Sequence, residues 1–294
     1  MNLIALLVGL FPILGWGLFP TIASKIGGRP TNQILGATLG SFLTGVGVSF
    51  LFHLPLPTGM VLLVGSLSGA GWGFGQIMGF KGYQLVGSSR VLPIHTGVQM
   101  VINTLWGVLF LGNWARLDAK IMGFSALLII VVGTYLTIWQ QHRQAASVHK
   151  MRVAIGYQLI GSAGYWLYSA APRFINLSGL TVFLPQGIGM VVAAVIYCLA
   201  RLKHENAFKE RVSYQQIISG VVLSLAALSY FIATQPNMLG LSTAFVLSQA
   251  YVIVSTLTGI FWLHQTKTPR EMVVTLLGLA LIVVAAALTA FIPN

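Results

Sequence analysis

Apolar runs long enough to cross a membrane follow one another along almost the whole chain, and this feature constrains the fold most. A transmembrane helix needs roughly 20 predominantly apolar residues. The runs lack the period-two alternation of a transmembrane β-barrel. The sequence therefore predicts an all-α integral membrane protein with ten transmembrane helices, which begin near Leu3, Thr31, Thr58, Val91, Lys120, Val153, Ser178, Gln215, Met238 and Met272.

Two apolar stretches are too long for one helix, and each contains a favourable site for a turn. His53-Leu54-Pro55-Leu56-Pro57 divides the stretch after Arg29, and Gln235-Pro236-Asn237 divides the stretch after Arg211. Proline interrupts a helix because it lacks the backbone N–H and clashes with the preceding turn. The first run has no basic leader or cleavage site before it, so we expect it to be retained as a helix.

The composition excludes a water-soluble domain. Only 7% of the residues are charged and 56% are hydrophobic, whereas a soluble domain carries about 25% charged residues. The net charge of +12 would suggest nucleic acid as the partner of a soluble protein. Here the basic residues occupy short connectors between apolar runs, so we expect the lipid bilayer and no nucleic acid as partner.

The distribution of Lys and Arg predicts the orientation, because cytoplasmic loops are enriched in them. With the N-terminus outside, only Arg116, Lys120 and Arg173 fall outside. The basic residues that then fall inside are Lys25, Arg29, Lys81, Arg90, Arg143, Lys150, Arg152, Arg201, Lys203, Lys209, Arg211, Lys267 and Arg270. We therefore expect both termini to be extracellular.

An internal repeat divides the chain into halves. At an offset of 152 residues, Thr104-Leu105-Trp106-Gly107-Val108-Leu109-Phe110 falls on Thr256-Leu257-Thr258-Gly259-Ile260-Phe261-Trp262. The predicted units are a first five-helix repeat (1–142), a basic cytoplasmic linker (143–152) and a second five-helix repeat (153–294). Because each unit crosses an odd number of times, the copies have inverted topology, a common design of secondary transporters. The alternative is a chance match between two apolar sequences.

The predicted spans lack the groups that catalysis or metal binding would need. Asp118 and Glu271 lie at helix starts, and Glu205 and Glu210 lie in a connector. The single cysteine, Cys198, allows no internal disulfide and no metal-ligand cluster. We therefore expect neither an enzyme nor a metal or cofactor.

The fourth span carries the most informative polar pattern. His95, Gln99, Asn103 and Trp106 recur at intervals of four, four and three residues and so share one helix face. Amides and an imidazole are costly in lipid, so this face should meet the bundle interior or a cavity. The alternative is that these side chains only bond neighbouring helices. Such neutral groups suit a polyhydroxylated ligand.

Other spans contribute further candidates for such a site. Amides offer hydrogen bonds to hydroxyl groups, and aromatic rings offer surfaces for the C–H faces of a sugar. Among ionisable groups, His95 alone lies on the polar face of a span and can change charge near neutral pH, which makes it the candidate for proton coupling. The predicted substrate-binding residues are Trp16, Trp72, Gln76, Gln99, Asn103, Tyr165, Trp166 and Gln249.

Several sequence blocks carry a resemblance to known proteins. They are Leu14-Gly15-Trp16-Gly17-Leu18-Phe19-Pro20 with Lys25, Gly27-Gly28-Arg29-Pro30-Thr31-Asn32-Gln33-Ile34, Gly69-Ala70-Gly71-Trp72-Gly73-Phe74-Gly75-Gln76, Gly87-Ser88-Ser89-Arg90 with Pro93, and Ser248-Gln249 with Val254-Ser255-Thr256-Leu257. Together these blocks resemble the bacterial glucose and ribose uptake proteins of the drug/metabolite transporter superfamily. A further block, Tyr165-Trp166-Leu167-Tyr168-Ser169-Ala170-Ala171-Pro172, is more similar to the ribose-type members.

The resemblance implies uptake of ribose or a glucose-like monosaccharide across the plasma membrane by a ten-helix secondary carrier with proton symport. Two departures concern acidic residues of glucose-type members, because this chain has Gly112-Asn113-Trp114 and His264-Gln265-Thr266-Lys267 at those places. They favour a pentose. The superfamily's ten-helix members are often drawn with both termini inside, against the charge distribution above.

Two other functions remain as alternatives. An exporter of amino acids or small lipophilic metabolites would belong to the same superfamily, although an amino acid would favour charged partners that the spans lack. A membrane enzyme or scaffold is the second, and an enzyme would need an acid, base or nucleophile set that cannot be assembled from these spans.

Overall fold

The computed structural model describes most of the chain. The described residues are 3–110, 114, 116–141, 145–175, 177, 179–235, 237–265 and 267–290. They form helices joined by short connectors, with no strand among them. The helices are α1 (Leu3–Ile26), α2 (Pro30–Leu51), α3 (Gly59–Val86), α4 (Ser88–Phe110), α5 (Leu117–Ile138), α6 (Ala145–Ala170), α7 (Phe183–Ala200), α8 (Arg211–Gln215), α9 (Ile217–Ala233), α10 (Gly240–Ser248), α11 (Tyr251–Trp262) and α12 (Pro269–Ala290), with 3-10 turns η1 (Ala171–Ile175), η2 (Gly179–Val182) and η3 (Ala207–Lys209).

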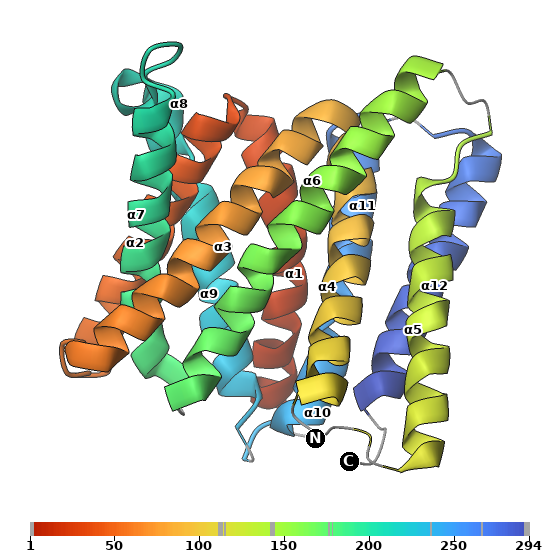
Figure 1. Ribbon diagram of the computed structural model, residues 1–294, viewed down its shortest axis with the longest axis horizontal. Coiled ribbons are helices and arrows are strands. Elements are labelled where there is room, and N and C mark those ends of the chain that lie inside the picture. Colours follow the sequence, from red (N-terminus) through yellow and green to blue (C-terminus); the bar gives the residue numbers. More distant parts are fainter. Residues whose placement is uncertain are drawn as a thin grey trace.

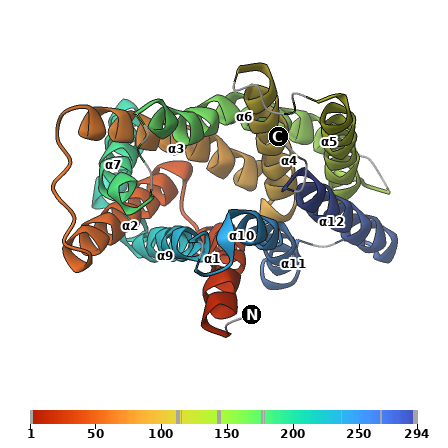
Figure 2. The ribbon, with the colours of Figure 1, turned by 90° about the horizontal axis from the view of Figure 1, so that it is seen from below.

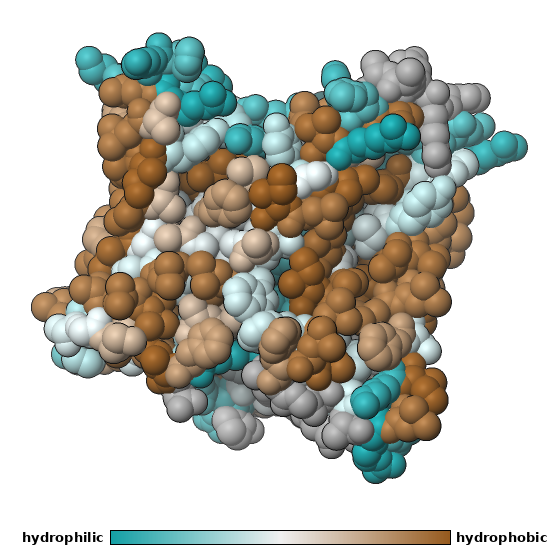
Figure 3. All heavy atoms as spheres, viewed as in Figure 1, coloured by the Kyte–Doolittle hydropathy of each residue, from teal (hydrophilic) through white to brown (hydrophobic). Residues whose placement is uncertain are grey.

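Seven segments of the described chain are long and apolar enough to cross a membrane. Helices α4 and α6 are as long but more polar, and α10 and α11 are each shorter. The segments are Leu3–Ile26, Pro30–Leu51, Gly59–Val86, Leu117–Ile138, Gly179–Ala200, Arg211–Ala233 and Pro269–Leu288. Large apolar side chains such as Leu7, Leu63 and Leu128 are exposed on the outside of the bundle, and Figure 3 shows brown side chains along its flanks. The chain is a multi-pass membrane protein.

Both predicted helix breaks are observed. α2 ends at Leu51 and α3 begins at Gly59. α9 ends at Ala233, and α10 begins at Gly240 with φ of 72°. The segments between them contain the prolines that the sequence places there, which cannot continue a helix.

The ninth predicted helix is interrupted, unlike the continuous span expected from Met238. α10 ends at Ser248 and α11 begins at Tyr251, with Gln249 and Ala250 in a turn between them. The amide of Ala250 donates to the carbonyl of Leu247 at 3.2 Å, which is the tighter i to i−3 pattern. The break therefore divides the predicted ninth span into two short helices.

Much of the predicted basic linker 143–152 is helical. Its residues from Ala145 onward belong to α6, and residues 142–144 lie outside the described part of the chain. Ala, Met, Lys and Arg are good helix formers, and no Gly or Pro interrupts this segment. The helix therefore begins before the apolar run does.

The helices pack in an ordered set of pairs. α3 packs against α6 and α7, α1 against α9 and α11, α2 against α7 and α9, α4 against α6 and α11, and α5 against α12. α5 and α12 lie together at one side of the bundle (Figures 1 and 2). Glycines allow the closest crossings: a Cβ at Gly189 would lie 1.8 Å from the carbonyl oxygen of Ser66, and one at Gly69 would lie 1.9 Å from that of Gln186. Only glycine permits these backbone contacts between α3 and α7.

The two ends of the bundle differ in charge. α1 begins and α12 ends at the same end, whereas α8 lies at the opposite end (Figure 1), where hydrophilic side chains gather (Figure 3). At the α8 end, Arg29 forms ion pairs with Glu205, at 2.9 Å, and with Glu210. Asn32 Nδ2 donates to Glu210 Oε2 at 2.9 Å. These bonds join the connector after α7 to the corner between α1 and α2.

Candidate functional site

A cavity of about 430 Å³ lies inside the bundle. Helices α1 to α4, α6, α7 and α9 to α11 contribute side chains to it, while α5 and α12 contribute none of its described lining. Its volume falls within the range of about 300–1,000 Å³ that is typical of small-molecule sites. The cavity is thus formed between helices from both halves of the chain.

The cavity brings together most of the residues that the sequence nominated. Trp166 does not line it, because its ring packs edge-on against Trp106 with 4.8 Å between ring centroids. The coupling candidate His95 lines the cavity. So do the substrate-binding candidates Trp16, Trp72, Gln76, Gln99, Asn103, Tyr165 and Gln249.

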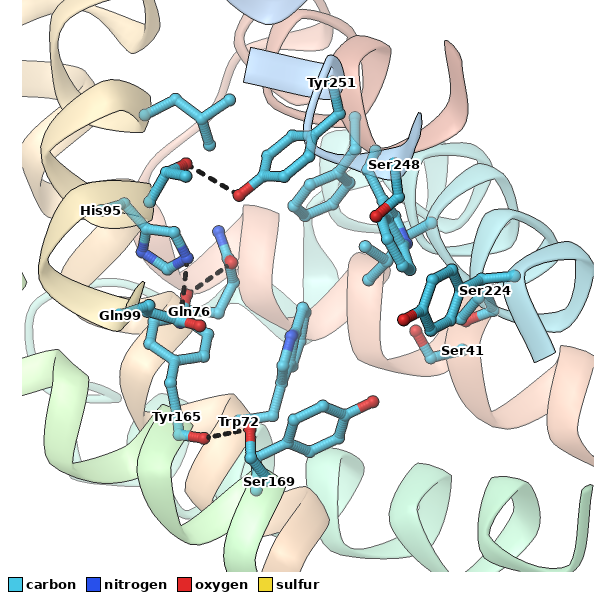
Figure 4. A pocket seen from close by; sticks show the side chains of 18 of the residues that line it. Ser41, Trp72, Gln76, His95, Gln99, Tyr165, Ser169, Ser224, Ser248 and Tyr251 are labelled. Atoms are coloured by element: carbon cyan, nitrogen blue, oxygen red, sulfur yellow. Dashed lines mark hydrogen bonds between the residues drawn. The ribbon is translucent and has the colours of Figure 1, made fainter. Parts of the chain in front are cut away.

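One wall of the cavity is a hydrogen-bonded cluster centred on His95. The Nδ1 atom of its ring lies 3.3 Å from Gln158 Oε1, and its Nε2 atom lies 3.1 Å from Gln99 Nε2. The ring also meets Tyr165 edge-on at 4.4 Å between centroids. The Tyr165 hydroxyl donates to Gln76 Oε1 at 2.8 Å, and Figure 4 shows His95, Gln99, Gln76 and Tyr165 facing one another. The four-residue spacing on α4 places His95 and Gln99 on one face.

Two buried polar side chains of the lining keep hydrogen-bonding capacity unused. Gln76 is 4% exposed, and its Nε2 atom has no partner among the described residues. Ser41 Oγ is buried and also has no partner among them. Because an unpaired buried polar group costs about 1–3 kcal/mol, these groups favour a ligand that can bond them.

Aromatic rings form another part of the lining. Trp16 lies 5.3 Å from Tyr230 and 6.1 Å from Tyr251, between ring centroids. The Tyr251 hydroxyl is within 2.7 Å of Thr96 Oγ1, which fixes its position. Trp72 packs near Phe19 at 6.4 Å. These rings offer apolar faces next to the polar wall.

The break between α10 and α11 places Gln249 at the cavity. Its side chain is 8% exposed, and its Nε2 atom makes only long bonds of 3.4 Å, to Phe245 O and Ser248 Oγ. Tyr251, the first residue of α11, also lines the cavity. Interrupted helices at a central site are typical of secondary transporters.

Several residues that line the cavity are not among the site candidates that the sequence pattern indicated. Ser224 and Tyr230 both line the cavity from α9, where Leu223, Ala227 and Tyr230 recur at intervals of four and three residues along one helix face. That signal is weak, because an aromatic residue in an apolar run can equally face lipid. Other lining residues not nominated include Ser41, Gln186, Ser248 and Tyr251.

The cavity carries no formal charge in its described lining. None of its lining residues is Asp, Glu, Lys or Arg. Within the described residues there is also no group of three His, Cys, Asp or Glu that could hold a metal ion. Amides, hydroxyls and aromatic rings in this arrangement can bind a neutral polar molecule.

The chain is similar along almost its whole length to known transport proteins. A family profile described as "Sugar transport protein" matches residues 7–292. A protein of Staphylococcus epidermidis (strain ATCC 12228) named "Putative ribose uptake protein RbsU" is 53% identical over 292 residues, covering 99% of this chain and all of that protein. A protein of the same name from Staphylococcus aureus (strain Mu50) is 50% identical with the same coverage.

The fold also occurs in a solved structure. A crystal structure of a protein with 17% sequence identity superposes with a TM-score of 0.61 and covers 98% of each chain. This likeness concerns the fold alone. The match of residues 7–292 to the family profile shows that the chain belongs to the sugar transport protein family, and the 50–53% identity to the two named uptake proteins agrees with this.

Proposed function

We propose that this protein takes up a neutral monosaccharide, with ribose as the first candidate, across the plasma membrane. The observation that carries the proposal is the uncharged cavity, whose amide and hydroxyl groups lie beside the rings of Trp16, Trp72 and Tyr230. A monosaccharide has hydroxyls for the former and C–H faces for the latter. The names of the relatives from two Staphylococcus species support ribose.

We propose that transport occurs by alternating access between two inverted five-helix repeats that together make ten crossings. The packing pairs support this: exchanging α1 with α6, α2 with α7, α3 with α9, α4 with α11 and α5 with α12 reproduces the same set of pairs. For example, α1 against α11 becomes α6 against α4. Transporters of this design hold their site between the repeats and move one against the other.

We propose that the α8 end is cytoplasmic and that both termini are extracellular. α1 begins and α12 ends at the end of the bundle opposite to α8 and the basic connector after α7 (Figure 1). The positive-inside rule supports this orientation. Uptake would then carry the sugar from the end where the termini lie to the α8 end.

We further propose that sugar uptake is coupled to proton movement and that His95 carries the proton. No carboxylate lines the cavity among the described residues, and His95 is the histidine of the lining. Its Nε2 atom contacts Gln99, itself a candidate for sugar binding, so a proton on that nitrogen would change a substrate contact. An imidazole is the side chain whose charge changes most readily near neutral pH.

The test is uptake of radiolabelled ribose by the purified full-length protein in proteoliposomes, with and without an imposed pH gradient. We expect saturable ribose entry that unlabelled ribose inhibits and leucine does not. Liposomes without protein provide the background. Ribose and glucose entry no faster than that background, together with leucine exchange, would replace this proposal by the amino-acid exporter.

A further inference from the structure

We propose that Gln158 is a positioning residue that fixes which end of the Gln99 carboxamide faces the substrate. This inference rests on the proposed sugar transport. Gln158 lies on α6 and is 2% exposed. It is not among the residues that line the cavity, so it acts on the sugar only through other side chains.

Hydrogen bonds connect Gln158 to His95 and His95 to Gln99, and we call this series the relay. A backbone carbonyl fixes the orientation of its first member. Gln158 Nε2 donates to the carbonyl oxygen of Met78 at 3.4 Å. Because a carbonyl oxygen only accepts, the amide of Gln158 must point its nitrogen at Met78 and its oxygen at His95. Gln158 Oε1 lies 3.3 Å from His95 Nδ1, and an amide oxygen only accepts. The proton of the neutral imidazole is therefore on Nδ1.

The second step fixes Gln99. A neutral imidazole with its proton on Nδ1 has a lone pair on Nε2, which accepts a hydrogen bond. The atom within reach is Gln99 Nε2, at 3.1 Å, which only donates. The carboxamide of Gln99 therefore directs its nitrogen at His95. With the nitrogen held by the ring, the oxygen is the other hydrogen-bonding end of this cavity-lining residue, and it can accept a bond from a ligand.

Gln76 has the opposite polarity. The Tyr165 hydroxyl donates to Gln76 Oε1 at 2.8 Å, so the Gln76 oxygen is occupied. The Gln76 nitrogen is buried and unpaired, and it can only donate. The wall thus offers an acceptor at Gln99 and a donor at Gln76, and Figure 4 shows both side chains close to His95 and Tyr165.

This arrangement predicts a specific selectivity. A hydroxyl group can donate or accept, whereas a fluorine in its place cannot donate. The hydroxyl that meets Gln99 must donate, so its replacement by fluorine should weaken binding. The group that meets Gln76 must accept, so fluorine should be tolerated there better than hydrogen. A buried amide left unpaired by the wrong analogue weakens binding.

The experiment measures inhibition of labelled ribose exchange by singly deoxygenated and singly fluorinated ribose analogues, in proteoliposomes of the full-length protein. We expect the parental protein to reject one fluorinated analogue by about tenfold or more relative to ribose, which corresponds to about 1.4 kcal/mol. In Gln158→Met, the relay is cut and the Gln99 amide can turn. The rejection of that analogue should then fall to about threefold or less.

Three further measurements make the result decisive. Ser162→Ala, one turn along α6 from Gln158, removes a hydroxyl that bonds the Leu159 carbonyl of its own helix, and it should keep the parental selectivity. Gln99→Met should lose the rejection as Gln158→Met does, and it serves as the second variant if Gln158→Met does not fold. The Gln76-dependent preference should survive in both.

The failures can be distinguished. Absence of sugar exchange in the parental protein would overturn the proposed function itself. Normal ribose exchange with equal inhibition by every fluorinated analogue would overturn the relay alone. Unchanged selectivity in Gln158→Met would also overturn it, because Gln99 would then hold its orientation without Gln158.

Discussion

Gln265, in the connector between α11 and α12, caps the start of α4 through its contact with Ser89. The Ser89 amide donates to Gln265 Oε1 at 3.0 Å, and Gln265 Nε2 donates to Ser88 Oγ at 3.4 Å. The preceding Gly87 has φ of 85°, and a Cβ there would lie 2.5 Å from Gln265 Oε1. These contacts close the bundle at the end opposite the termini, between connectors from the two halves of the chain.

Gln265→Ala should loosen this closure. One neutral hydrogen bond contributes about 1 kcal/mol, so the population open at this end should rise by about fivefold. The measurement is the labelling rate of a cysteine at Leu92, a cavity residue near this end of α4, by an impermeant maleimide added to inside-out vesicles in a Cys198→Ala background. An unchanged labelling rate would show that Gln265 is no part of the closure.

The spans and the polar wall could be predicted because each rests on a local pattern. The spacing of His95, Gln99 and Asn103 needs only the helix period, and that period places all three on the cavity. Trp166 was also a candidate, but it does not line the cavity. It follows Tyr165 directly, and neighbouring residues on a helix point about 100° apart, so when Tyr165 faces the cavity Trp166 packs on Trp106 instead.

The break at Gln249 could not be predicted in this way. Ser248-Gln249-Ala250-Tyr251 contains neither Gly nor Pro, so no local breaker marks it. At the break, Ser248 Oγ and Gln249 Nε2 both donate to the carbonyl of Phe245, and side chains that enter the backbone hydrogen-bond ladder are one cause of helix breaks without proline. Tyr230 and Tyr251 were missed for a related reason, because an aromatic residue in an apolar run has the same local signal whether it faces lipid or a cavity.

Gln99→Ala and Asn103→Ala should each reduce ribose transport by about tenfold or more, because each removes hydrogen bonds to a bound hydroxyl inside the membrane. Initial uptake rates in proteoliposomes, normalised to the amount of reconstituted protein, would measure the loss. Ser162→Ala is the matched control outside the lining. Parental rates in both variants would remove this face of α4 from the site.

The orientation can be tested with single cysteines in a Cys198→Ala background. His149, near the start of α6, and Asn237, in the connector between α9 and α10, are exposed and lie at opposite ends of the bundle (Figure 1). An impermeant thiol reagent added to intact cells should label position 237 only, because the proposed orientation places the basic α8 end in the cytoplasm. Labelling at position 149 in place of 237 would reverse the orientation and the direction assigned to uptake.

Lys267 should make stability depend on pH in the alkaline range. Its ammonium donates to Thr137 O at 2.8 Å and Thr275 Oγ1 at 2.7 Å. Burial lowers the pKa of Lys267 from 10.5 to about 8. Arg90 adds a smaller lowering effect, and the negative charge of Glu271 opposes both. Between these two pH values the unfolded chain binds more protons than the folded one, so stability should rise as pH increases from about 8 to about 10.5.

The measurement for Lys267 is thermal unfolding of the detergent-solubilised protein across this pH range. Lys267→Met removes the titrating group, so the rise should be absent from that variant. A parental melting temperature that rises no more than that of Lys267→Met would show that the ammonium is not destabilised in the folded state.

His95→Gln tests whether sugar movement is coupled to protons. Glutamine cannot carry a proton, so the variant should lose uphill ribose accumulation driven by a pH gradient while it retains exchange at equal concentrations on both sides. The polar groups around the ring are Gln158 and Gln99, with Tyr165 edge-on. The other titratable lining residues are the tyrosines Tyr83, Tyr168, Tyr230 and Tyr251.

In the state described, His95 accepts a hydrogen bond from Gln99 through Nε2. A proton on that nitrogen would require Gln99 to turn its oxygen toward the ring and its nitrogen toward the sugar, which would link protonation to a substrate contact.

If accumulation survives in His95→Gln, coupling does not pass through the cavity histidine. Asp118 and Glu271, each in the first turn of its helix, are then the carboxylates to substitute next. If neither the parental protein nor the variant accumulates ribose against a gradient, the protein is a facilitator.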